Sequence, residues 1–229
     1  MRNVRPDIAI QADSRLAVLQ LLESITDQDR DGGGRTAKVN QLVRSLDNAD
    51  YQAFLDCFQR ALPGAIVMGD STQPAYFAAS QYHPPVPRRF ASAATGYGTL
   101  GYALPAAFGA KLAMPDTPVI ALIGDGGLQF TINELSSGVE AGLGVAVVLW
   151  NNRRYEMIAQ NFEDAGMAPI ACDIHTPDFI GIAKAYGCNA KRVTSLGELE
   201  IELQQSQRRS VPTLIEVMEE DFLSSTTAK

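Results

Sequence analysis

One stretch of this sequence, which runs from Gly124 to Asn152, constrains the fold more than any other. The apolar run 119–123 is short and bounded by glycine, which favours a buried parallel strand over a helix. Apolar positions then recur with helical spacing over 131–141, and a second buried strand is expected over 145–150. The stretch therefore predicts a strand–turn–helix–strand unit, in which two polar clusters follow the two strands: Gly124-Asp125-Gly126-Gly127 and Asn151-Asn152.

These two clusters have the composition of a site for a phosphate and a metal ion. Gly124, Gly126 and Gly127 let the backbone turn sharply and expose N–H groups at a helix start, which suits a diphosphate. Asp125 would repel phosphate unless a hard divalent cation lay between them. Such a cation accepts the Asp125 carboxylate, the Asn152 side-chain oxygen, a backbone carbonyl and phosphate oxygens. Each cluster alone also fits an ordinary turn, but the pair at this spacing favours a binding site.

The sequence Gly124-Asp125-Gly126, followed after 24 residues by Asn151-Asn152, resembles the cofactor signature of thiamine diphosphate-dependent enzymes. The resemblance covers about residues 46–222 and is closest to the acetolactate synthase and 2-oxo acid decarboxylase group. It implies that Asp125, Asn152 and the backbone carbonyl of Arg154 bind Mg²⁺, which anchors the diphosphate. It also implies decarboxylation of a 2-oxo acid, followed either by aldehyde release or by formation of a new carbon–carbon bond.

Two further segments are implied to contact the cofactor. Thr72 and Gln73 follow the strand expected over 65–68 and would contact the diphosphate, although a helix cap before 75–80 is an equally good interpretation. The segment Gly98-Thr99-Leu100 lies among small residues, so its backbone can approach a ligand closely. The resemblance implies that this segment grips the aminopyrimidine ring. The Gly98 carbonyl would accept the 4-amino group, and the Leu100 side chain would bend the cofactor into a V shape.

The segment after Asn152 is implied to border the substrate pocket, with Ile158 and Asn161 facing the substrate. Glu156 departs from the family, which commonly has glycine at this position. A carboxylate there could pair with a cationic group such as a guanidinium, which points to a 5-guanidino-2-oxopentanoate decarboxylase-like enzyme. The alternative, which the sequence favours, is a solvated helix residue paired with Arg153 or Arg154.

The remaining segments predict a three-layer α/β/α domain with a mainly parallel sheet of about six strands. Residues 37–229 are expected to form the thiamine diphosphate- and Mg²⁺-binding domain. Residues 1–36 are expected to be the remnant of a preceding central domain, or else an ordinary N-terminal arm. They comprise a strand-like run over 6–10, a helix capped by Ser14 and a glycine-rich linker over 27–35. Other expected features are helices over 50–62, 106–112 and 195–207, strands over 89–92, 191–193 and 213–217, a loop over 162–171, a helix start at Thr176-Pro177 and a frayed tail over 223–229.

Composition argues against several other classes of protein. A hydrophobic content of 46% with 20% charged residues describes a soluble globular protein, and a net charge of −7 disfavours a nucleic-acid partner. The apolar runs are too short for a membrane span, and the polar N-terminus is unlike a signal peptide. Three cysteines and two histidines disfavour disulfides and zinc sites. These features together predict a cytoplasmic protein.

The resemblance also implies a part that this sequence does not supply. The family requires a glutamate from a pyrimidine-binding domain, usually on a neighbouring subunit, and no segment here matches that domain. The chain alone is therefore expected to bind the cofactor weakly and to turn over no 2-oxo acid. An apolar face that should meet the missing domain would be exposed in a monomer, so a homo-oligomer is expected. Two alternatives stay open: the chain is a natural small subunit of a two-subunit decarboxylase, or it is a non-catalytic nucleotide-binding module. Binding of a dinucleotide is disfavoured because the sequence lacks Gly-x-Gly-x-x-Gly after the first expected strand.

Overall fold

The structure is a computed structural model, which describes residues 6–25, 31–46 and 49–223. The chain divides into two compact units, Met1–Leu42 and Val43–Lys229. In the first unit, helix α1 (Ser14–Ser24) follows Asp13, whose carboxylate accepts the N–H groups of Arg15 and Leu16 at 3.0 and 3.1 Å. The helix cap is therefore Asp13, and the prediction of Ser14 is wrong. Residues 6–10 do not form the expected strand, because a strand needs a neighbouring strand and the described part of this unit has none.

The glycine-rich segment expected to be a linker is helical from Gly32 onward. Helix α2 (Gly32–Leu46) begins after Asp31, whose carboxylate accepts the N–H of Gly34 at 2.7 Å. This bond satisfies one of the free N–H groups at the helix start and offsets part of the cost of helical glycine, about 1 kcal/mol per residue. The linker prediction is therefore wrong for residues 32–35, and residues 27–30 lie outside the described part of the chain.

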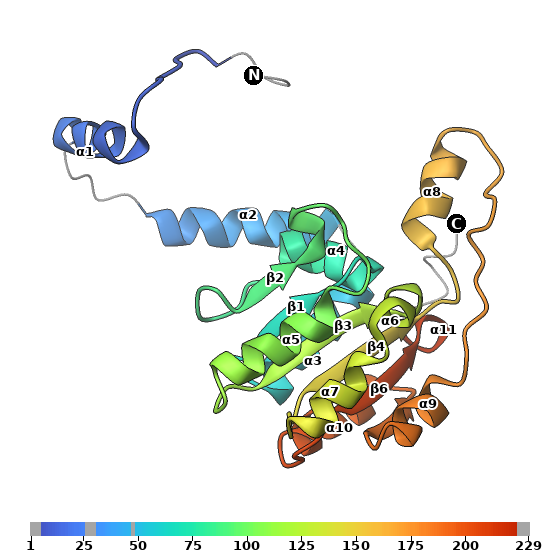
Figure 1. Cartoon of the computed structure of the whole chain (residues 1–229). Helices are drawn as coiled ribbons and strands as arrows, with labels where there is room; N and C mark the ends of the chain where they lie inside the picture. Colours follow the sequence, from blue (N-terminus) through green and yellow to red (C-terminus); the bar gives the residue numbers. More distant parts are fainter. Residues whose placement is uncertain (1–5, 26–30, 47–48, 224–229) are drawn as a thin grey trace. The chain divides into compact units, whose positions relative to one another are not determined.

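The second unit is built on six parallel strands in the order β2-β1-β3-β4-β6-β5 (Figure 1). Each strand pairs only with parallel neighbours, so their carboxyl ends lie at the same edge of the sheet. The predicted parallel sheet of about six strands is confirmed. The strands are β1 (Ile66–Gly69), β2 (Phe90–Ser92), β3 (Val119–Gly124), β4 (Ala146–Asn151), β5 (Asn189–Val193) and β6 (Thr213–Met218).

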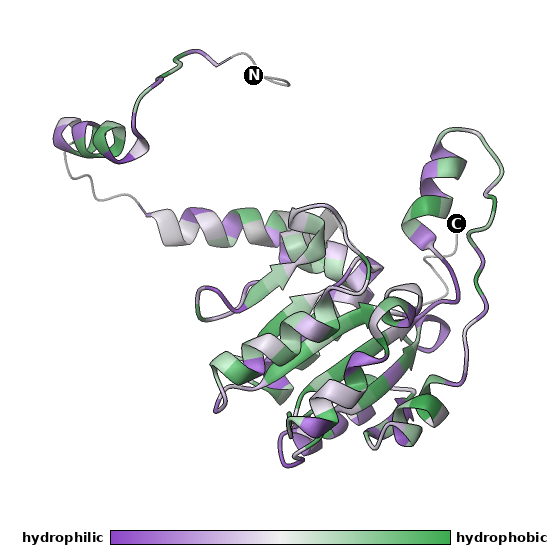
Figure 2. Ribbon diagram, in the orientation of Figure 1, coloured by the Kyte–Doolittle hydropathy of each residue, from purple (hydrophilic) through white to green (hydrophobic). Residues whose placement is uncertain are grey.

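Helices cover both faces of this sheet, which gives the expected α/β/α layers. Every residue of β3 and β4 is buried, and Figure 2 shows these strands as strongly hydrophobic. Alternate side chains of β3 enter two separate cores, with Ile120 and Leu122 in one and Ala121 and Ile123 in the other. The first core contains residues of α3 (Ala49–Ala61), α4 (Gln73–Gln81) and α10 (Leu196–Ser206); the second contains residues of α5 (Ala103–Ala113), α6 (Asp125–Thr131), α7 (Glu134–Glu140) and α9 (Phe179–Ala185).

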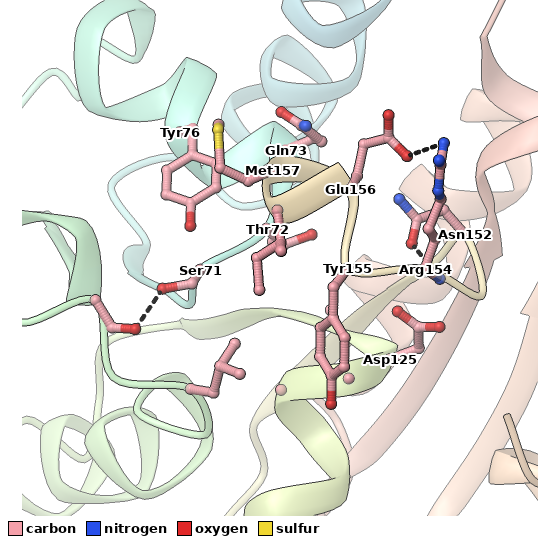
Figure 3. Close-up of a pocket in the computed structure, with 16 residues that line it drawn as sticks. Ser71, Thr72, Gln73, Tyr76, Asp125, Asn152, Arg154, Tyr155, Glu156 and Met157 are labelled. Atoms are coloured by element: carbon pink, nitrogen blue, oxygen red, sulfur yellow. Dashed lines mark hydrogen bonds and ion pairs between the residues drawn. The ribbon is translucent and has the colours of Figure 1, made fainter. Parts of the chain in front are cut away.

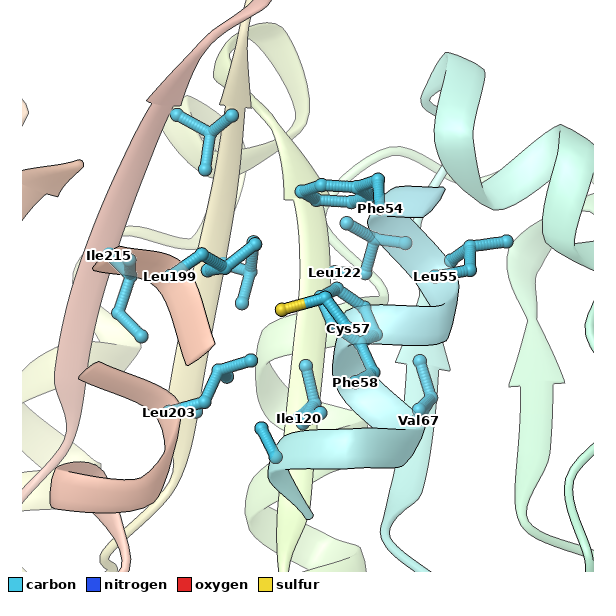
Figure 4. Packing of buried hydrophobic residues seen from close by; sticks show 14 of the residues in the cluster. Phe54, Leu55, Cys57, Phe58, Val67, Ile120, Leu122, Leu199, Leu203 and Ile215 are labelled. Atoms are coloured by element: carbon cyan, nitrogen blue, oxygen red, sulfur yellow. The ribbon is translucent and has the colours of Figure 1, made fainter. Parts of the chain in front are cut away.

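Aromatic packing in the first core fixes the end of β4 (Figure 4 shows part of this core). The ring of Phe54 lies 5.0 Å from the rings of both Phe58 and Trp150, in edge-to-face geometry. Such pairs contribute about 0.5–1.5 kcal/mol each beyond the burial of their surface. Trp150 is the chain's one tryptophan and directly precedes Asn151-Asn152. Its fluorescence is therefore a local probe of this strand end as well as of unfolding.

Two helix boundaries differ from the prediction. The helix expected over 131–141 is divided into α6 and α7, and α6 begins at Asp125, directly after β3. The N–H groups of Leu135 and Ser136 reach carbonyls three residues back at 3.1 Å, so a tightened turn separates the two helices. Helix α9 is capped by Asp178, which accepts the N–H of Gly181 at 2.9 Å, and the predicted start at Thr176-Pro177 is wrong.

The other predicted elements lie close to their expected positions, and the capping box before α10 is present. The Ser195 hydroxyl accepts the N–H of Glu198 at 3.3 Å, while the Glu198 carboxylate reaches back to the N–H of Thr194 at 2.9 Å. Helix α8 (Glu156–Asp164) extends into the segment expected to be a loop. Within the described residues, no helix has the length and apolar character needed to cross a membrane. Only Leu223 of the expected tail is described.

Candidate cofactor site

A cavity of about 210 Å³ opens at the carboxyl ends of β1, β3 and β4 (Figure 3). The chain passes from β1 outward to β2 and then returns to β3 on the other side of β1. Such a reversal of strand order leaves a crevice at the strand ends, where α/β proteins bind ligands. The residues that line the cavity are Ser71, Thr72, Gln73, Tyr76, Gly98, Leu100, Gly124, Asp125, Gly126, Gly127, Asn152, Arg154, Tyr155, Glu156, Met157 and Ile158.

The first turn of α6 forms one wall of this cavity, and two of its glycines are required by close packing. A Cβ atom on Gly126 would overlap the ring of Tyr155. A Cβ atom on Gly127 would lie 2.7 Å from Oδ1 of Asp70. Because both positions lack side chains, the backbone at the start of α6 borders the cavity directly and its N–H groups can face an anion there.

Asp125 is the buried charged group of this wall. It is 2% exposed, and its Oδ2 atom has no hydrogen-bond partner among the residues that the structure describes. Burial raises the pKa of the carboxyl to about 6, although hydrogen bonds from the backbone of Gly126 and Arg153 act in the opposite direction. A buried carboxylate oxygen without a partner is unfavourable, and a cation bound beside it would remove that penalty.

Asn152 lies opposite Asp125 on a tight turn after β4. Its side-chain oxygen accepts the N–H of Arg154 at 3.2 Å, and its amide nitrogen donates to Glu219 at 3.4 Å. Arg153, which lies between Asn152 and Arg154 in sequence, has a left-handed backbone with φ of 58°. The neighbouring Asn151 points back into the domain, where it donates to the buried Glu216 at 2.8 Å. The Asn152 oxygen, which still has a second lone pair, is therefore the amide oxygen available at the cavity.

The oxygen atoms at this position fit a hard divalent cation. Across the parts of the chain that the structure describes, no group of three histidine, cysteine, aspartate or glutamate side chains could hold a metal ion. A cation here would instead combine the Asp125 carboxylate with neutral oxygens, from the Asn152 side chain and the Arg154 backbone, and with oxygens of its ligand. Such a set of oxygens, with one protein carboxylate and ligand phosphates, is typical of Mg²⁺.

The opposite wall is formed by the segments after β1 and β2. Figure 3 shows Ser71 and Tyr76 on this side of the cavity and Asp125 and Arg154 on the other. The Gly98 carbonyl accepts the Ser71 hydroxyl at 3.1 Å, and Gly98 has φ of 66°, which favours glycine. Thr72 occupies the N-cap position of α4, but its side chain makes no capping hydrogen bond. The Thr72 hydroxyl therefore does not cap α4, which was the alternative interpretation of this residue.

Arg154 and Glu156 lie together at the rim beside α8. The Arg154 guanidinium pairs with Glu156 at 3.4 Å, with Glu163 at 3.1 Å and with Asp173 at 3.2 Å. The hydrogen bond to Glu163 is the main cause that raises the pKa of Arg154. Glu156 is thus paired with arginine, as the alternative interpretation expected, while it also borders the cavity. Three carboxylates around one guanidinium leave this rim with an excess of negative charge.

Most residues that the sequence analysis selected are brought together here. Those that line the cavity are Thr72, Gln73, Gly98, Leu100, Gly124, Asp125, Gly126, Gly127, Asn152, Arg154, Glu156 and Ile158, whereas Thr99 and Asn161 do not. Sequence reasoning missed Ser71, Tyr76, Tyr155 and Met157. Three of these adjoin selected residues in sequence. Tyr76 lies three residues after Gln73 on α4, which helical spacing could have indicated.

The fold and the cavity define a parallel α/β domain whose strand ends present backbone N–H groups and oxygen atoms of the kinds that suit an anion and a hard cation. Residues 70–217 match the family model described as the thiamine pyrophosphate enzyme C-terminal TPP binding domain. This match covers more than half of the chain, which therefore belongs to the C-terminal cofactor-binding domains of thiamine diphosphate-dependent enzymes. The resemblance seen in the sequence is confirmed.

Individual relatives come from the decarboxylase and acetolactate synthase groups. A probable 2-ketoarginine decarboxylase of Pseudomonas aeruginosa is 35% identical over 218 residues, which are 92% of this chain and 39% of that protein. The acetolactate synthase isozyme 3 large subunit of Escherichia coli is 32% identical over 222 residues, which are 90% of this chain and 38% of that protein. The thiamine diphosphate-dependent 4-hydroxybenzoylformate decarboxylase of Rhodococcus jostii RHA1 is similar in structure, with a TM-score of 0.65 and 30% sequence identity. The similar region covers 74% of this chain and 32% of that protein. The chain thus spans about two fifths of these curated relatives' length.

Proposed function

We propose that this chain supplies the diphosphate- and Mg²⁺-binding part of the active site in a thiamine diphosphate-dependent enzyme that acts on 2-oxo acids. The enzyme would be a decarboxylase or an acetolactate synthase-like carboligase. The observation that carries the proposal is the buried Oδ2 atom of Asp125 at the edge of the cavity, which has no hydrogen-bond partner in the described part of the chain. The family match and the relatives' names support the same conclusion.

Each wall of the cavity would hold a different part of the cofactor. Asp125, Asn152 and the Arg154 carbonyl would bind Mg²⁺, while the start of α6 together with Thr72 and Gln73 would surround the diphosphate. The Gly98 carbonyl and the Leu100 side chain would position the ring half, with Thr99 supporting their backbone. When bound, the cofactor supplies the chemistry that removes carbon dioxide from a 2-oxo acid, and the protein supplies position and electrostatics.

Calorimetry tests this proposal directly. Thiamine diphosphate should bind the chain in the presence of MgCl₂, and EDTA should abolish the binding. NAD should not bind under either condition, which separates this function from that of a nucleotide-binding module. Binding of NAD, or binding of thiamine diphosphate that is insensitive to EDTA, would contradict the proposal.

The chain alone should turn over no 2-oxo acid. Of the carboxylates that line the cavity, Asp125 is assigned to Mg²⁺ and Glu156 is paired with Arg154. No cavity-lining carboxylate among the described residues is therefore left to exchange a proton with the ring. We infer that a pyrimidine-binding domain, from the same or a neighbouring chain in a homo-oligomer, provides the carboxylate that exchanges this proton. Steady decarboxylation by the isolated 229 residues would contradict this inference.

The negative rim favours a substrate with a cationic side chain. Glu156 borders the cavity beside an arginine that two other carboxylates already neutralise, and the relative with 35% identity is named for 2-ketoarginine. Ile158 would lie along the aliphatic part of such a substrate, and Asn161 would support it from one turn further along α8. These positions make 5-guanidino-2-oxopentanoate the first substrate to test.

Substitution of Glu156 with glutamine should reduce that preference. In the complete enzyme, Glu156→Gln should raise KM for the guanidino acid several-fold, because one charge-assisted hydrogen bond is lost. KM for pyruvate should stay unchanged. A steady-state screen of basic, branched and aromatic 2-oxo acids measures both effects. Glu163→Gln is a matched control, since Glu163 pairs with the same arginine but does not line the cavity. Equal changes for the two substrates would contradict the assignment.

A further inference from the structure

Asp70 is a fully buried carboxylate that the motifs above leave without a role. It directly follows β1, and its side chain is 0% exposed. In the described part of the chain it has no cationic partner, and burial raises the pKa of its carboxyl. A buried aspartate without a cationic partner is rare, so the hydrogen bonds that Asp70 accepts indicate what stabilises it in the interior.

Within the described residues, the hydrogen bonds to this carboxylate all come from backbone N–H groups. Oδ1 accepts the N–H of Ser71 at 2.9 Å and that of Gly101 at 3.2 Å, while Oδ2 accepts the N–H of Ala103 at 2.9 Å. Two of these donors belong to the segment 98–103, which lies 30 residues away in sequence and forms a wall of the cavity. Only a carboxylate offers acceptors in both directions, because a carboxamide would present a donor to one of these N–H groups.

Other contacts hold the same segment from its remaining sides. Gly101 has φ of 83°, and its carbonyl accepts the hydroxyl of Thr131 at 3.1 Å. The Gly98 carbonyl accepts the hydroxyl of Ser71, the residue next to Asp70. The segment is thus tied to the end of β1 by two adjacent side chains and to the end of α6 by a third. Its glycine-rich backbone has few side chains of its own that could fix its shape.

We infer that Asp70 is a positioning residue, which holds the segment 98–103 in the shape that receives the ring half of the cofactor. This inference rests on the proposed function. It separates the cavity into two parts, since the segment held by Asp70 faces the ring and the turns after β3 and β4 face the diphosphate and the metal ion. Loss of the Asp70 carboxylate should therefore affect one half of the ligand and not the other.

The variant Asp70→Asn tests this separation because it keeps the size of the side chain and its packing against Gly127. Calorimetry should compare thiamine diphosphate with inorganic pyrophosphate, both with MgCl₂. The variant should bind thiamine diphosphate about tenfold more weakly, because one or two of the hydrogen bonds that hold the segment are lost. Its affinity for pyrophosphate should stay within about twofold of the wild type. Amide hydrogen exchange should show lost protection at Gly101 and Ala103.

Each outcome supports or overturns the inference. A parallel loss of both ligands would show a general structural role, and unchanged affinity with unchanged exchange would show no role. If Asp70→Asn does not fold, Ser71→Ala removes only the bond to Gly98 and should show a weaker form of the same selectivity. If the wild type binds neither ligand, the proposed function fails; exchange at Gly101 and Ala103 still decides whether Asp70 fixes the segment.

Discussion

The variant Asp125→Asn should lose Mg²⁺-dependent binding of thiamine diphosphate, with a fall in affinity of more than about 100-fold. Removal of an outer-shell partner of a metal ion already costs about 10–100-fold, and Asp125 is the single carboxylate proposed to touch the ion itself. Asparagine has the same shape but brings no negative charge and presents a donor on one side. Calorimetry with MgCl₂ at pH 8 measures the loss.

The same substitution should make the ligand-free chain more stable. The pKa of Asp125 is about 6 in the folded chain, above the ordinary value of 3.8, because burial penalises the ionised form. The carboxyl is protonated in both states below about pH 4, so it costs nothing there. As the pH rises through 4 to 6, the unfolded state ionises first and stability is lost. The penalty reaches about 3 kcal/mol above pH 6.

Denaturation by urea, followed through Trp150 fluorescence, should therefore separate the two proteins by pH. Asp125→Asn should exceed the wild type by up to about 3 kcal/mol at pH 8 and match it near pH 4. Asp116→Asn is the control, since Asp116 is exposed and should alter neither stability nor binding. A variant that is less stable than the wild type at pH 8, or that retains Mg²⁺-dependent binding, would contradict the assignment of Asp125 to the cation.

The sheet could be predicted from the sequence because its central strands are continuous apolar runs bounded by glycine. Those runs also placed Asp125 and Asn152 at neighbouring strand ends, which is why both could be expected beside the cavity that the structure shows there. The start of α6 was predicted too late because Asp125, Gly126 and Gly127 read as a turn, while in the fold they form the first turn of a helix. Asp13 and Asp178 were missed as caps because a serine or threonine nearby fitted the same pattern.

The supporting residues had no local signal at all. Asp70 contacts a segment 30 residues away, and Glu219 contacts Trp150 and Asn152 from 67 or more residues away. Such partners are set by strand order, which places the residues after β1 and β6 on either side of the β3 and β4 ends. Hydrophobic periodicity identifies strands but not their order, so the side chains that orient the site appear only in the fold.

Glu219 is the support whose loss should cost most after that of Asp125. Its Oε2 atom accepts the indole N–H of Trp150 at 2.7 Å and the amide of Asn152 at 3.4 Å, which directs the Asn152 oxygen away from Glu219. Burial raises the pKa of this carboxyl, and its charge in turn contributes to the raised pKa of Asp125. A nearby cation would therefore be attracted by two carboxylates, although only Asp125 is placed to bind it.

The variant Glu219→Ala should weaken Mg²⁺ binding about 10–100-fold at saturating thiamine diphosphate, as expected for loss of an outer-shell partner. Glu219→Gln keeps an acceptor for both donors and should lose less than about tenfold, which separates orientation from charge. Titration with MgCl₂, followed by Trp150 fluorescence, measures the Mg²⁺ affinity of both variants. Glu220→Ala is the matched control, because Glu220 is exposed and pairs with the side chain of Arg153, at 3.6 Å, rather than with Asn152. If glutamine is as damaging as alanine, Glu219 acts through its charge and not by orienting Asn152.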